Sequence, residues 1–165
     1  FVILSILSCN KQDNPIFRIV FNPVTISVSR TMSSFEAHSF LAPVKTNYKS
    51  ILDANGISEE DINYIRPVFA RIERIFDGDL IFVETMSIRV CPLGSSNSSN
   101  CGKESFWRDE EFVSKNQITL NNSNIDDVKD IVLNDDVELQ IIFEDMYSPP
   151  ENNFDLRVRV EFGVW

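Results

Sequence analysis

The feature that most constrains the fold is the alternation of apolar residues with mostly polar ones in two stretches near the C-terminal end. In residues 137–143 an apolar side chain occupies every second position, and residues 156–164 repeat this pattern. A period of two places one face of an extended strand in a core and the other in solvent. The intervening residues 147–153 are rich in Pro, Asn and Ser, which favour turns. We therefore expect the two stretches to pair as an antiparallel hairpin.

Further short strands are predicted upstream, at residues 16–21, 24–29, 80–91 and 118–120, with turn residues between them. Short helices are predicted at residues 47–55, from Ser58 onward, and at 124–132. These elements predict a mainly β protein. We expect an immunoglobulin-like antiparallel β-sandwich with two or three short helical insertions. The 13 Phe residues among 165 residues favour an aromatic-rich core, to which Phe35, Phe40 and Leu41 are expected to contribute.

Residues 62–76 are ambiguous between helix and strand. Their apolar residues are spaced like a helical stripe, but Pro67 removes a backbone donor and disfavours helix at Arg66. We predict that a helix ends near Ile65 and that a strand runs from about Val68 to Ile75.

The first residues of the sequence are typical of an export signal. An apolar run, residues 1–8, ends at Ser8-Cys9 and is followed at once by polar residues. Residues Ile6-Leu7-Ser8-Cys9 have the aliphatic and small residues of a bacterial lipobox. A buried terminal strand is the alternative interpretation. We expect residues 1–8 to be residual signal peptide, residues 9–15 a lipidated Cys and tether, and residues 16–165 a single β-sandwich domain.

Lipidation of Cys9 has consequences for location and for the other two cysteines. Two or three acyl chains would hold the protein on a membrane permanently. Asn10, rather than Asp, after the cysteine favours the outer membrane, on its periplasmic or surface face. In an exported protein Cys91 and Cys101 are then free to form a disulfide across a loop rich in Ser and Asn. Two reduced thiols in a cytosolic protein are the alternative.

The formal net charge of −10 disfavours nucleic-acid binding, because an acidic surface repels phosphate backbones. The sequence has no catalytic signature. His38 is its single histidine, and no second ligand at metal-binding spacing accompanies it. The acidic residues at positions 126, 127, 130, 135 and 136 lack the spacing of a calcium loop and are expected to form a solvated face. We therefore predict no catalytic residues, no metal site and no cofactor.

Two places in the sequence, the group at residues 106–108 and the last residue, Trp165, are candidates for a binding surface. Phe106 and Trp107 stand beside Arg108, and aromatic rings with a neighbouring cation suit sugars or protein partners. Core packing beside the disulfide loop is the alternative for this group. Trp165 alternates to the outward side of its strand, where it would cover a sheet edge or contact a neighbouring molecule.

The lipobox at residues 6–9, the alternating strands and the C-terminal part from Asn124 to Val164 together resemble small uncharacterised envelope lipoproteins of Bacteroidota. The resemblance implies a short tether, one β-sandwich domain and an envelope location. It implies no catalytic residues.

The expected function is therefore that of a non-catalytic, lipid-anchored envelope protein that binds or scaffolds another envelope protein or a glycan. One alternative is a carrier that holds a hydrophobic ligand in an internal cavity of the sandwich. The other is a hydrolase without a recognisable motif.

Overall fold

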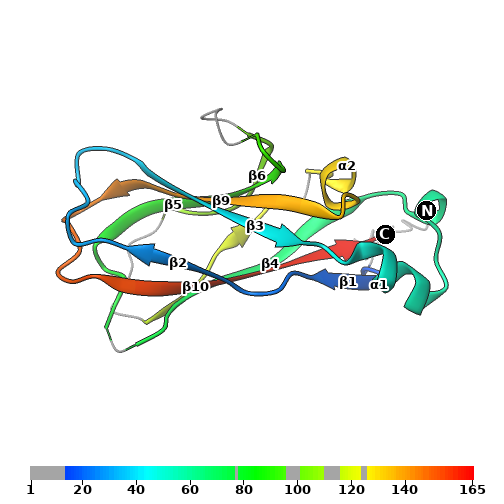
Figure 1. The fold of residues 1–165 in the computed structure, drawn as a ribbon, viewed down its shortest axis with the longest axis horizontal. Helices are drawn as coiled ribbons and strands as arrows, with labels where there is room; N and C mark the ends of the chain where they lie inside the picture. The colour runs from blue at the N-terminus through cyan, green and yellow to red at the C-terminus, as the bar shows by residue number, and fades with distance from the viewer. Residues whose placement is uncertain (1–13, 77, 96–100, 110–115, 124–125) are drawn as a thin grey trace, which may run out of the picture.

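The computed structural model describes residues 14–76, 78–95, 101–109, 116–123 and 126–165. Two antiparallel sheets face each other across one core (Figure 1). Sheet A contains β1 (Phe17–Val20), β2 (Val24–Val28), β4 (Ile65–Arg74), β7 (Gln117–Thr119) and β10 (Phe154–Val164). Sheet B contains β3 (His38–Lys45), β5 (Val83–Pro92), β6 (Lys103–Arg108), β8 (Asn121–Asn122) and β9 (Asp136–Met146). The predicted mainly β sandwich is confirmed.

The order of the strands differs from that of an immunoglobulin domain. In sheet A, β10 lies between β4 and an edge that β1 and β2 share, and β7 follows β4. The order in sheet B is β3-β9-β5-β6-β8. An immunoglobulin sandwich instead places strands A, B, E and D in one sheet and C, F and G in the other. The present order is that of a jelly roll, so the immunoglobulin-like part of the prediction is not confirmed.

The predicted C-terminal hairpin is wrong. β9 lies in sheet B between β3 and β5, whereas β10 lies in sheet A and pairs with β1, β2 and β4. The connection at residues 147–153 therefore crosses from one sheet to the other. The alternation correctly predicted that each strand has one buried face. It carries no information on which strand becomes the neighbour, because any amphipathic strand offers the same backbone groups.

Aromatic rings from both sheets meet in the core. Phe162 of β10 lies 5.0 Å from Phe21 and 5.7 Å from Phe106 of β6, measured between ring centroids. All three side chains are almost fully buried. Phe40 reaches the core as predicted, with its ring 5.2 Å from that of Phe143. Phe35 and Leu41 do not: Phe35 is 99% exposed and Leu41 is 40% exposed.

The ambiguous stretch resolves into a strand that begins earlier than predicted. The helical segment before it, η1 (Glu59–Asp61), ends at Asp61, and β4 already begins at Ile65. The register against β10 shifts where Phe162 pairs with Pro67, and a shift of this kind marks a bulge. A bulge tolerates proline inside a sheet, so Pro67 breaks the pairing pattern rather than the strand.

The helical segments gather at one end of the sandwich, together with the C-terminus (Figure 1). α1 (Tyr48–Asn55) matches the helix predicted at residues 47–55 and ends at Gly56, which adopts a left-handed φ of 65°. At η1, the hydroxyl and backbone N–H of Ser58 donate to the Asp61 carboxylate, and these bonds hold the pKa of Asp61 below its ordinary value of 3.8.

α2 (Lys129–Val132) covers only the last part of the predicted helix at 124–132, and residues 124 and 125 lie outside the described parts. In the described chain, none of the helices has the length and apolarity that crossing a membrane requires.

Candidate functional site

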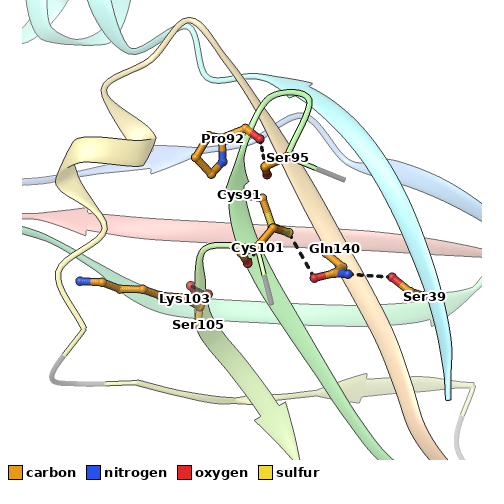
Figure 2. Close-up of a disulfide and its surroundings, with 8 residues drawn as sticks. All are labelled: Ser39, Cys91, Pro92, Ser95, Cys101, Lys103, Ser105 and Gln140. Atoms are coloured by element: carbon orange, nitrogen blue, oxygen red, sulfur yellow. Dashed lines mark hydrogen bonds between the residues drawn. A yellow bond between two sulfur atoms is a disulfide. The ribbon is translucent and has the colours of Figure 1, made fainter. Parts of the chain in front are cut away.

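The predicted Cys91–Cys101 disulfide is present, and it joins the end of β5 to the start of β6 (Figure 2). Both cysteines are buried, and Sγ of Cys101 lies 3.2 Å from the side-chain oxygen of Gln140. The amide of Gln140 in turn donates to the hydroxyl of Ser39 at 3.0 Å. The disulfide is thus buried in a packed environment to which β3, β5, β6 and β9 all contribute. Its surroundings indicate a structural bridge.

The group at residues 106–108 does not form one surface. Phe106 is fully buried and packs on Phe162, whereas Trp107, its neighbour along the strand, is half-buried on the other side of sheet B. Arg108 donates to the backbone carbonyl oxygen of Thr119 at 3.2 Å. Core packing, the alternative interpretation, is therefore correct for Phe106. Only Trp107 and Arg108 keep some exposure.

Trp165 closes the end of sheet A. Its ring stacks on Tyr64 with the centroids 5.3 Å apart, and its backbone carbonyl accepts a 2.7 Å hydrogen bond from Asn63. The ring also lies over Gly163, where an added Cβ would come within 2.6 Å of it. Trp165 thus covers the end of the inner strand β10 rather than the predicted sheet edge, and a glycine two residues earlier makes room for it.

The residues weighed for catalysis or metal binding are engaged in local structure. A ring nitrogen of His38 lies 2.7 Å from the backbone carbonyl oxygen of Ser33. One carboxylate oxygen of Asp127 accepts hydrogen bonds from the backbone N–H groups of Ile65 and Lys129. Within the described ranges, no three His, Cys, Asp or Glu side chains are grouped so that they could hold a metal ion.

Three loops gather at the end of the sandwich opposite the helices, at the left in Figure 1, and we call this region the loop end. They are the β2–β3, β4–β5 and β9–β10 loops. Hydrogen bonds join them: Tyr147 N–H donates to the Phe82 backbone carbonyl at 2.9 Å, and Arg30 N–H donates to the side-chain Oδ1 of Asn153 at 2.8 Å. The loop end is therefore a connected surface rather than three independent loops.

The loop end exposes large apolar side chains. Phe35 is 99% exposed and Phe76 is 74% exposed, and these are the two most exposed large hydrophobic residues of the described chain. Ile81 and Tyr147 add two more that are about half exposed. Phe76 also lines a hollow of about 400 Å³, together with Val28, Phe154 and four polar residues, Ser27, Ser29, Asn153 and Asp155. Several exposed large apolar side chains on the loops of one end favour a binding site there.

A second concentration of side chains lies on the outward side of sheet A. Residues of β10 that alternate with its buried positions face outward, and so do their partners on β1 and β4. This surface carries Arg18, Arg66, Arg71, Arg157 and Arg159, and we call it the arginine face. The outward side of β10 was predicted. A strand at residues 68–75 was also predicted, but its place beside β10 was not, because alternation does not record which strands pair.

The arginine face contains a pocket of about 200 Å³, lined by Pro23, Arg71, Glu73, Arg157 and Arg159. Arg157 donates to Glu73 at 2.9 Å, and Arg159 donates to Glu161 at 2.8 Å. Each guanidinium carries five N–H donors, so one such bond leaves further donors on each arginine. The pocket can thus offer hydrogen bonds and positive charge to an anion.

The comparisons with known proteins add no relative. No protein-family model, curated protein or solved structure matches this chain.

Proposed function

We propose that this protein is a non-catalytic binding module, held by lipid on Cys9 at the outer membrane of a bacterial envelope, that captures another envelope protein through its loop end. The observation that carries the proposal is that the loops of this end expose four large apolar side chains, Phe35, Phe76, Ile81 and Tyr147. Exposed aromatic side chains cost free energy in water, and they are the residues that most often anchor protein interfaces.

The point at which the described chain enters β1 supports a loop end that faces away from the anchoring membrane. The described chain enters β1 at the end of the sandwich where the C-terminus lies, because Ile16 N–H donates to the Val164 carbonyl at 2.8 Å. β10 runs from the loop end to that end over 11 residues, which is about 37 Å of extended strand. A lipid attached seven residues before Ile16 therefore leaves the loop end free to face away from the anchoring membrane.

The anchor can be tested separately from the partner. Metabolic labelling of the producing bacterium with a fatty acid should tag the full-length protein, and Cys9→Ala should abolish the tag. The variant should keep the Cys91–Cys101 bond, because Cys9 takes no part in it. Labelling that persists in the variant would refute lipidation at this residue.

Site-specific photo-crosslinking in intact cells tests the partner. A photoreactive phenylalanine analogue placed at Phe35, Phe76 or Tyr147 should give one discrete adduct with an envelope protein. Leu93 is the matched control, because it is a large apolar residue, 53% exposed, near the opposite end of the sandwich. The same adduct from Leu93, or none from the three loop positions, contradicts the proposal.

A small hydrophobic ligand is the second candidate for the same end. The 400 Å³ hollow beside Phe76 and Phe154 favours it, since pockets for small ligands start at about this size. Native mass spectrometry of protein purified from its envelope distinguishes the two: a bound lipid-sized mass that is lost in Val28→Asp supports the carrier.

A further inference from the structure

The arginine face reverses the sign of charge that dominates this protein. The chain has a formal net charge of −10. On the outward side of β1, β4 and β10, five arginines stand against three acidic residues, Glu73, Asp155 and Glu161, which leaves an excess of two positive charges. An acidic protein that collects arginines on one face presents a local site for a negative group.

The arrangement within this face is costly without a ligand. Arg71 and Arg159 are direct partners across β4 and β10, and like charges in directly opposed positions destabilise a sheet. Their acids are shared: Glu161 bonds both Arg18 and Arg159, and Glu73 bonds Arg157 while its other oxygen lies 3.9 Å from Arg71. An anion placed between Arg71 and Arg159 would offset this repulsion.

We propose that the pocket of Arg71, Arg157 and Arg159 binds the carboxylate of a uronic acid residue in an acidic polysaccharide. The three arginine side chains are 35%, 50% and 43% exposed, so their donors are accessible yet held by the sheet. Arginine binds carboxylates with paired N–H donors in a planar fork. The proposal is independent of the loop end, which lies on other residues.

The remaining pocket residues favour a sugar acid over a bare inorganic anion. Glu73 is an acceptor inside the pocket, which opposes sulfate or phosphate but accepts a hydrogen bond from a sugar hydroxyl. Pro23 adds an apolar wall for a ring face. Nucleic acid fits poorly, because DNA carries one charge per about 1.7 Å and this face has an excess of only two.

The test is titration calorimetry with the full chain and an oligogalacturonate as the probe, at low salt. Arg159→Gln and Arg71→Gln should each weaken binding about tenfold or more, the expected loss for one charge-assisted contact. Lys45→Gln is the control, because Lys45 is an exposed cation on sheet B that pairs with Asp136. It should bind like the unmodified protein. Unchanged thermal unfolding of each variant shows that the sheet is intact.

The choice of probe distinguishes the possible anions. The methyl ester of the same oligosaccharide should not bind, because it lacks the charge. Inorganic phosphate and dextran sulfate, a sulfated polysaccharide without carboxylates, should bind more weakly than the oligogalacturonate. Phosphate binding as tight as that of the oligogalacturonate would overturn the proposal and leave a general anion site, and so would dextran sulfate binding that is tighter and insensitive to Arg159→Gln. So would oligogalacturonate binding that survives both arginine variants, or its absence from the unmodified protein.

Discussion

Replacing Phe162 with Ala should lower the free energy of unfolding by about 4 kcal/mol, the range found for buried aromatic residues. Phe162 has no exposed surface, and its ring lies between Phe21 of sheet A's edge and Phe106 of sheet B. Its removal leaves a cavity between the two sheets, so both should lose stability together. Urea unfolding followed by tryptophan fluorescence measures the loss, and a single transition with a lower midpoint is expected.

Phe35→Ala is the matched control for Phe162→Ala. The same chemical change at a side chain that is 99% exposed should alter stability by less than about 0.5 kcal/mol. A second variant isolates the contact between the sheets: in a double-mutant cycle, Phe106→Ala and Phe162→Ala should couple by about 1 kcal/mol. A loss below about 1 kcal/mol for Phe162→Ala would show that this ring does not hold the core.

Removing the disulfide should have the second largest effect. The double variant Cys91→Ala, Cys101→Ala frees a loop of sequence separation 10, and the loop-entropy relation gives a loss of about 3 kcal/mol. Both residues are replaced together because one remaining buried thiol would add its own packing change. Urea unfolding of the variant, compared with the oxidised protein, measures this difference.

Two observations check the assignment to the disulfide. Mass mapping without reductant should find Cys91 linked to Cys101, and Cys9→Ala should unfold at the same urea concentration as the unmodified protein. Equal stability of the oxidised protein and the double variant would mean that the bridge does not restrict the unfolded chain. Because β5 and β6 pair next to the bridge, the loss should appear in both strands by hydrogen exchange.

The two binding surfaces differ in how far the sequence could predict them. Arg157 and Arg159 were placed on an outward strand face from alternation alone, and the structure confirms this. The strand that carries Arg71 was predicted at residues 68–75, but its pairing with β10, which places Arg71 opposite Arg159, was not. Phe35 was expected in the core because of its apolar side chain. Hydrophobicity states only the preference of a side chain, and in the loop that carries Phe35 it is Met32 that packs against the core while Phe35 is exposed.

The features that were predicted correctly are local: the inward faces of the alternating strands, the end of α1 near residue 55, and the disulfide across a short loop. These features depend on residues a few positions apart. The separation of β9 and β10 into different sheets, and the pairing of Arg71 with Arg159, depend instead on the tertiary arrangement. Each amphipathic strand can pair with any other, so the order is chosen by the burial of all apolar faces at once. That total involves contacts far apart in the chain, and no local pattern records it.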